Sequence, residues 1–455
     1  MTVRDLARPR HDINHVLVYG QSLSSGWEGW PALSVAPRTD SLMLGRSVRA
    51  LEEAAPAWTP VDGAAFRPLA ATVQPPGAGG PLSPDAVAAL RPGDVALGET
   101  VAEAAVHGWR ARQLAAGAAS PGAARLLASV CGVGGRSIEA LSRGAEPALF
   151  DRLTGCVAAA RAAAEALGLS YGVAAWLLLQ GENNVVGADG CLTDGPGYAA
   201  RLARLHADVT AHVAQGAAGQ GAAPALFIYQ TSGDCADETL AIAQAQLDYA
   251  LGHPGCFLAA PVYPVTSKGW HLDANGYRWL GAQFGKVMHR VLTLGQGWRP
   301  LHPLRARQDG RVLEVDFHVP VPPLRWGAPF AGHRRHQPRE GGFAVRDSDG
   351  EVGIERIDIA GPCSLRMVLA RPPGAGAVLR YADRTRQGRG CLHDSDGEVA
   401  DECFAPDAAF GAPPAPDIAA VLGTPYPLMN WCTAFAMPIR PATQPVPLAA
   451  WGILR

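Results

Sequence analysis

The segment HVLVYGQSLSSG, residues 15–26, decides the fold. Its apolar or aromatic residues, 16–19, predict a buried strand. The strand leads directly into Gly20, Gln21 and Ser22, which are small or polar and favour a turn. Open parallel sheets bind their ligands beyond the carboxyl ends of their strands. Ser22 is therefore either an ordinary turn residue or a side chain that the strand presents for chemistry.

Strand and helix signals alternate over the first 300 residues. Near-continuous apolar runs predict buried strands, and the longer runs between them predict helices. This alternation predicts a doubly wound α/β fold, in which helices cover both faces of a parallel sheet. The predicted strands are 15–20, 126–133, 172–181, 225–233 and 256–263, and the predicted helices are 99–116, 146–167, 198–213, 238–251 and 274–293.

The pattern changes after Trp298. Apolar and polar residues then alternate in several short segments, which is typical of half-buried strands. We therefore predict an α/β domain over 1–298 and a β-rich, sandwich-like domain over 299–455. Residues 27–98, rich in Pro, Gly and Ala, form a long insertion that is either a lid over the site or a surface feature. The alternating segments are 311–322, 342–347, 354–359, 364–370 and 377–383.

Composition restricts the classes of partner and compartment. The formal net charge is -2, which predicts no nucleic-acid partner. The apolar runs are far shorter than the ~20 residues of a membrane span, and residues 1–15 lack the apolar core of a secretory signal. Nine cysteines without a C-x-x-C motif favour reduced thiols and a cytoplasmic or particle-associated protein. The oligomeric state stays open.

Polar or glycine-rich segments follow four of the predicted strands, and a parallel sheet brings such segments to one edge. A serine nucleophile needs a base such as neutral imidazole, and acyl transfer needs N–H donors for the oxyanion. Ser22, His271 and the donors between them supply these groups without a metal ion or a cofactor. The segments are GQS (20–22), CGVGGRSI (131–138), QGENN (180–184) and SKGWHLDANGYRWLG (267–281).

The order of these motifs resembles that of the SGNH hydrolases, in particular the sialate O-acetylesterase-like branch of carbohydrate acetylesterases. The shared motifs are Gly-Gln-Ser, Gly-Gly-x-Ser-Ile, Gln-Gly-Glu and His-Leu-x-x-x-Gly-Tyr, within about residues 13–295. The resemblance implies a flavodoxin-like sheet, with Ser22 as the nucleophile and His271 as the base. The β-rich tail also resembles one that is attached to bacterial and phage-associated esterases.

The same resemblance assigns roles around the nucleophile. It implies an oxyanion hole that includes the N–H groups of Ser22 and Gly135. The third donor is either Asn183 or Gln180, and a carboxyl group organises the site through hydrogen bonds. The supporting residues are Gln21, Gly134 and Glu182, the last of which carries that carboxyl group.

One position departs from the family pattern. The family usually has an aspartate three residues before the histidine, and Lys268 stands there in this chain. Loss of an orienting carboxylate costs several powers of ten in rate where the base depends on it. Either a backbone carbonyl or another acid orients His271, or the site is impaired. The nearby acids are Asp234, Asp237 and Asp273, and Asp273 has a second interpretation as the N-cap of the next helix.

These residues predict a serine esterase that works through an acyl-enzyme on Ser22. The resemblance implies an acetyl group carried by a sugar or polysaccharide. Two alternatives stay open. One is a carbohydrate-binding or structural component, as in a phage-like particle, with weak or no catalysis, for which Lys268 is the main support. The other is a hydrolase or transferase of another acyl ester or amide.

Overall fold

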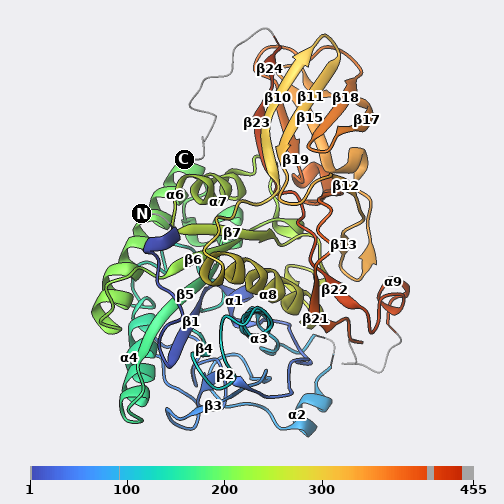
Figure 1. Cartoon of the computed structure of the whole chain (residues 1–455). Coiled ribbons are helices and arrows are strands. Elements are labelled where there is room, and N and C mark those ends of the chain that lie inside the picture. Colours follow the sequence, from blue (N-terminus) through green and yellow to red (C-terminus); the bar gives the residue numbers. More distant parts are fainter. Residues whose placement is uncertain (1–2, 92, 407–413, 443–455) are drawn as a thin grey trace.

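A computed structural model describes residues 3–91, 93–406 and 414–442 (Figure 1). Its α/β part contains a seven-stranded sheet in the order β3-β2-β4-β1-β5-β6-β7. All neighbouring strands are parallel except β2 and β3. The bounds are β1 (Ile13–Gly20), β2 (Arg38–Leu44), β3 (Phe66–Leu69), β4 (Arg125–Val130), β5 (Tyr171–Leu179), β6 (Ala225–Gln230) and β7 (Cys256–Pro261).

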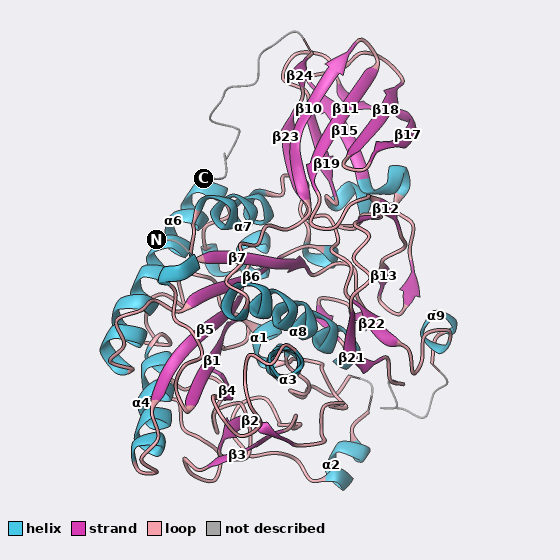
Figure 2. Cartoon of the chain, viewed as in Figure 1, coloured by secondary structure: helices cyan, strands magenta, loops and turns pink. Residues whose placement is uncertain are grey.

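Helices cover both faces of this sheet, as predicted (Figure 2). β4 and β5 lie on opposite sides of β1, so the connections that build the two halves of the sheet place their helices on opposite faces. α3 and α8 pack together on one face; α4, α6 and α7 lie on the other. The bounds are α1 (Ser22–Ser25), α2 (Pro84–Ala89), α3 (Val101–Ala115), α4 (Asp151–Glu165), α5 (Glu182–Val186), α6 (Gly195–Asp208), α7 (Ala241–Gly252) and α8 (Ala274–Met288).

The five predicted strands and five predicted helices of the α/β part are all present, with ends shifted by a few residues. Every residue of β1 and β5 is buried, as the apolar runs indicate. The insertion 27–98 supplies two strands, β2 and β3, that the sequence did not predict. β2 extends the main sheet beside β4. Its polar first residues, Arg38-Thr39-Asp40-Ser41, hide the strand pattern in the sequence.

The segment after Trp298 is β-rich, as predicted. One sheet has the order β17-β18-β11-β10-β24, and a second has the order β16-β15-β19-β23. Phe317 and Phe435, whose ring centroids are 6.3 Å apart, join the two sheets. Residues 407–413 and 443–455 of the predicted domain 299–455 lie outside the described residues. The bounds are β10 (His302–Asp309), β11 (Val312–His318), β12 (Arg325–Trp326), β13 (Phe330–Ala331), β14 (Arg334–Arg335), β15 (Phe343–Asp347), β16 (Gly350–Val352), β17 (Ile354–Gly361), β18 (Ser364–Leu369), β19 (Val378–Tyr381), β20 (Leu392–His393), β21 (Val399–Cys403), α9 (Pro416–Ala419), β22 (Pro425–Pro427), β23 (Phe435–Pro438) and β24 (Arg440–Pro441).

The β-rich segment is anchored at the carboxyl ends of β6 and β7. The Gln230 side chain, at the end of β6, donates to the Ala434 carbonyl at 2.9 Å and accepts from its N–H at 2.7 Å. The Tyr263 hydroxyl, just after β7, donates to the Cys432 carbonyl at 2.8 Å. Buried hydrogen bonds of this kind fix one element against another. The β-rich segment is therefore held against the sheet edge where the sequence places the polar motifs.

Two further findings concern the whole described chain. No helix in residues 3–91, 93–406 or 414–442 is long and apolar enough to cross a membrane. All nine cysteines are free thiols.

Candidate active site

The end of β1 presents Ser22 beside β5. At Gly20 the backbone has φ 138°, and a Cβ atom there would lie 2.0 Å from the Leu179 carbonyl oxygen. Only glycine fits this turn, because other residues disfavour the φ value and the space is filled. The Gln21 N–H donates to the same carbonyl at 2.8 Å, and Ser22 then begins α1. Ser22 therefore lies between β1 and β5, where the strand order reverses.

A short hairpin brings His271 to this serine. β8 (Ser267–Lys268) and β9 (His271–Leu272) pair antiparallel, with Lys268 opposite His271. The first turn residue, Gly269, has φ 77°, as the tight two-residue hairpin turn requires. The His271 Nε2 atom lies 2.9 Å from Ser22 Oγ. This is hydrogen-bond distance between a hydroxyl and an imidazole.

The second ring nitrogen of His271 contacts a carboxylate that the sequence analysis missed. His271 Nδ1 lies 2.9 Å from Glu28 Oε2. In the tautomer that suits both contacts, Nδ1–H donates to Glu28 while Nε2 accepts from the Ser22 hydroxyl. Glu28 has φ 60°, and its N–H donates to the Ala96 carbonyl at 3.1 Å. The far end of the insertion thus holds Glu28 in place.

None of the acids considered from the sequence is bonded to His271 in the described chain. Asp234 forms an ion pair with Arg389, and the Asp237 carboxylate accepts from the Leu240 N–H. Asp273 caps α8, since its carboxylate accepts from the Gly276 N–H at 2.7 Å. The capping interpretation of Asp273 is therefore confirmed. In the family's aspartate position, the Lys268 ammonium donates to the Trp30 carbonyl at 2.7 Å.

Gln21 fixes the loop after β5. Its Oε1 atom accepts from the N–H groups of Gly181 at 3.3 Å and Asn183 at 3.2 Å. Its Nε2 group donates to Asn183 Oδ1 at 3.2 Å. Because the Oδ1 atom of Asn183 is held in this way, its Nδ2 group is oriented as a donor.

Gln180 has a different environment from Asn183. Its Nε2 group donates to Asn184 Oδ1 at 2.6 Å, and its Oε1 atom accepts from the Tyr198 hydroxyl at 2.9 Å. Both ends of this buried amide are therefore engaged inside the protein. Gln180 therefore stabilises the end of β5, whereas Asn183, in the segment that follows, is half-buried.

The glycine segment after β4 is tied to the loop that carries Glu28. The Gly134 N–H and the Trp27 Nε1–H both donate to Glu53 Oε1, at 2.9 and 3.0 Å. The Trp27 ring lies beside the imidazole of His271, with centroids 6.0 Å apart. Gly135, which follows, is exposed and has φ 67°. Residues 27 and 53 of the insertion thus form one wall of the site.

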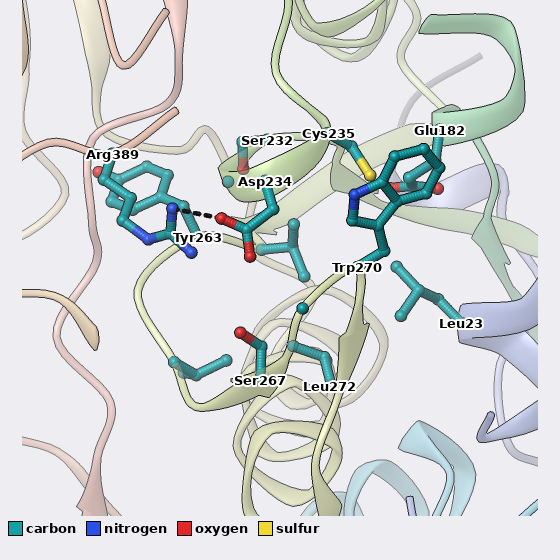
Figure 3. A pocket seen from close by; sticks show the side chains of 14 residues that line it. Leu23, Glu182, Ser232, Asp234, Cys235, Tyr263, Ser267, Trp270, Leu272 and Arg389 are labelled. Atoms are coloured by element: carbon teal, nitrogen blue, oxygen red, sulfur yellow. Dashed lines mark hydrogen bonds and ion pairs between the residues drawn. The ribbon is translucent and has the colours of Figure 1, made fainter. Parts of the chain in front are cut away.

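Glu182 lies behind the site. It is buried and accepts a hydrogen bond from the Tyr229 hydroxyl. Burial raises the pKa of this carboxyl above its usual value. Together with Leu23 and Leu272, the residues that follow Ser22 and His271 in the chain, it lines a small pocket (Figure 3).

The structure brings Ser22, His271, Gln21 and Asn183 together at one sheet edge, as expected. In the described residues, no group of three or more His, Cys, Asp or Glu side chains is arranged to hold a metal ion. The missed residue Glu28 is the first acid after Ser22 in the chain. That proximity is the only sequence signal for it, because its contact depends on a left-handed backbone and on the fold of the insertion.

Comparison with known proteins identifies the fold. No protein-family model matches the chain, and no curated protein matches its sequence. A carbohydrate acetylesterase from Xanthomonas citri shares the fold with a TM-score of 0.54 at 13% identity, over 93% of this chain and 80% of its own. A protein from Arabidopsis thaliana gives a TM-score of 0.38 at 17% identity, over 60% of this chain and 97% of its own. The protein NanS gives a TM-score of 0.35 at 14% identity, over 61% of this chain and 97% of its own. The α/β architecture with a β-rich region is therefore one that the Xanthomonas protein also has.

Proposed function

We propose that this chain is a serine esterase of the SGNH type. The observation that carries the proposal is the pair of 2.9 Å contacts that link Ser22 Oγ to His271 and His271 to Glu28. The strand order β4-β1-β5-β6-β7 supports a flavodoxin-like domain over 1–298. The two sheets after residue 299 support a sandwich-like second domain over 299–455.

The reaction runs through an acyl-enzyme. His271 Nε2 takes the proton of the Ser22 hydroxyl as Oγ attacks the ester carbonyl carbon. The tetrahedral intermediate collapses, and the alcohol leaves with that proton. A water molecule, deprotonated by the same nitrogen, then attacks the acyl-enzyme. The nitrogen returns that proton to Ser22 Oγ as the carboxylic acid leaves, which restores the serine. Glu28 holds the imidazole in the required tautomer and stabilises its protonated form.

The oxyanion is stabilised by the N–H groups of Ser22 and Gly135 and by the side chain of Asn183. The Ser22 N–H belongs to the first turn of α1, where N–H groups have no helical acceptor. Of the two amides left open by the sequence, Asn183 supports this role better, because Gln180 donates to Asn184. Donors fixed before the reaction stabilise developing charge without reorganisation.

The proposed substrate is an O-acetylated sugar or polysaccharide. The shared fold with the carbohydrate acetylesterase from Xanthomonas citri supports this class. We expect the wild type to release acetate from acetylated oligosaccharides, and His271→Ala to lower the rate by ~10³ or more. Acetate release that is unchanged in His271→Ala would contradict the proposal.

The two alternatives make different predictions. The non-catalytic alternative rests on Lys268 in the aspartate position, and Glu28 now contacts His271 instead. It predicts saccharide binding without acetate release. The alternative of another acyl bond predicts faster turnover of longer acyl esters or of amides than of acetyl esters, which a chain-length series measures directly.

A further inference from the structure

The hairpin that carries His271 and the loop that carries Glu28 touch at two points. The first is the contact of His271 Nδ1 with Glu28 Oε2 at 2.9 Å. The second is a hydrogen bond from the Lys268 ammonium to the Trp30 carbonyl at 2.7 Å. Lys268 and His271 are opposite each other in the β8–β9 pair, and Glu28 and Trp30 are close neighbours in the loop. The two contacts therefore lie side by side.

Trp30 is a fixed partner for the ammonium. It is buried and packs with Val73 and Ala96 in a small apolar cluster of the insertion. Lys268 Nζ also lies 4.9 Å from the centroid of the Trp30 ring, within the range of a cation–π contact. One ammonium thus contacts both the backbone and the side chain of Trp30, which joins the His271 hairpin to the core of the insertion.

Glu28 needs such support on both sides. Its φ of 60° is unfavourable for a residue with a Cβ atom, so the surrounding contacts must hold the backbone there. On the N-terminal side, the Tyr277 hydroxyl donates to the Trp27 carbonyl at 2.9 Å. On the C-terminal side, the Lys268 ammonium holds the Trp30 carbonyl. The Glu28 carboxylate is therefore carried by a short segment with a side-chain hydrogen bond at each end.

We propose that Lys268 is a positioning residue of the proposed esterase. Its ammonium holds the loop at Trp30, and the loop in turn holds the Glu28 carboxylate against His271 Nδ1. The Glu28 side chain is partly exposed, so its position depends on the backbone that carries it. The inference rests on the proposed function and assigns Lys268 a role that runs through the loop and not through the imidazole.

The first test is the hydrolysis of an activated acetyl ester by the full chain. Lys268→Met retains the aliphatic stem but removes the donor and the charge, so kcat should fall by about tenfold or more while KM changes by less than about threefold. Lys268→Gln, which is neutral and shorter, should show the same loss. Lys268→Arg retains a charged donor that can lie over the indole, and its kcat should stay within about threefold of wild type. Arg161→Met is the control, because it removes another half-buried cation, on α4.

A double-mutant cycle separates positioning from a general effect on the hairpin. Because Lys268 acts through the Glu28 carboxylate, Lys268→Met should lower kcat by less than about twofold in a Glu28→Gln background. An equal loss in both backgrounds would overturn the proposal, as would a wild-type kcat in Lys268→Met.

The second test does not depend on turnover. An imidazole Nδ1–H group that donates to a carboxylate is strongly deshielded and gives a far-downfield proton NMR resonance. We expect this resonance in wild type and in Lys268→Arg, and its loss in His271→Ala assigns it. Lys268→Met should shift or broaden it, and an unchanged resonance would overturn the positioning role. A wild type that shows the resonance but hydrolyses no acetyl ester overturns the proposed function, and the resonance of Lys268→Met still decides whether Lys268 holds the loop.

Discussion

Glu28 and His271 are 243 residues apart in the chain, yet Glu28 Oε2 lies 2.9 Å from the imidazole Nδ1. The carboxylate comes from the insertion after Ser22 and not from the loop that carries the histidine. Two segments, 22–28 and 267–272, thus supply the Ser22 hydroxyl, the imidazole that contacts it and the carboxylate that contacts the imidazole. Because Glu28 of the insertion contacts His271, the imidazole has a carboxylate partner although position 268 carries a lysine and not an aspartate.

Replacement of this acid tests its role. We expect Glu28→Gln to lower kcat by about 10²–10⁴, because a neutral amide does not stabilise the protonated imidazole and its NH2 group can donate to Nδ1, which favours the tautomer whose Nε2 cannot take the serine proton. The lower end of this range reflects the exposure of the Glu28 side chain, which is 35%. Water can reach it and replace part of its contact with His271. The measurement is steady-state hydrolysis of an activated acetyl ester.

Asp273→Asn is the control for Glu28→Gln. Asn retains an N-cap acceptor for α8 and removes the acid that is nearest to His271 in sequence. A loss of rate in Asp273→Asn with none in Glu28→Gln would assign the orienting role to Asp273.

The third oxyanion donor is tested at Asn183. Asn183→Ala should lower kcat by about 10²–10³ with little change in KM, the usual cost of one such donor. Val186→Ala, an exposed position on the same helix, serves as the control for a general effect on α5. An Asn183→Ala enzyme with wild-type kcat would remove Asn183 from the oxyanion hole.

The buried acid Glu103 gives a test by pH. Burial, followed by the nearby Glu99 carboxylate, raises the pKa of Glu103 from 4.5 to about 7. Between about pH 4.5 and about pH 7, the Glu103 carboxyl group therefore keeps its proton in the folded state and has lost it in the unfolded chain. This contribution to stability is full below about pH 4.5 and is lost as the pH rises through about 7.

Glu103→Gln mimics the protonated acid and retains a capping-box partner for Thr100. We expect the Tm of this variant, relative to wild type, to rise between about pH 5 and about pH 8. Glu165→Gln changes an acid whose side chain is 60% exposed and should show no such trend. If the Tm of Glu103→Gln and that of wild type changed with pH in parallel, the raised pKa of Glu103 would be contradicted.

Local sequence signals predicted much of the fold and part of the site. Residues 16–19 and the glycine after them specify a buried strand and a sharp turn, so the position of Ser22 follows from short-range chemistry. The role predicted for His271 rests on the order of four motifs along the chain and on the family that this order resembles. A histidine in this position alone is equally consistent with a structural role.

The rest depends on contacts between distant segments. Glu28 reaches His271 only because residue 96 holds its left-handed backbone, and no spacing rule encodes that contact. Arg389 reaches Asp234 from the β-rich segment, and their ion pair spans 155 positions. Such long-range pairs arise from tertiary packing, which sequence periodicity does not report.

The role of Ser22 is tested most directly by the hydrolysis of an activated acetyl ester by wild type and Ser22→Ala. Ser25→Ala, in the same short helix, controls for the loss of a buried serine. We predict that Ser22→Ala lowers kcat by ~10³ or more, as removal of a nucleophile does, and that Ser25→Ala stays within about tenfold of wild type. Wild-type turnover in Ser22→Ala would contradict the central claim that Ser22 is the nucleophile.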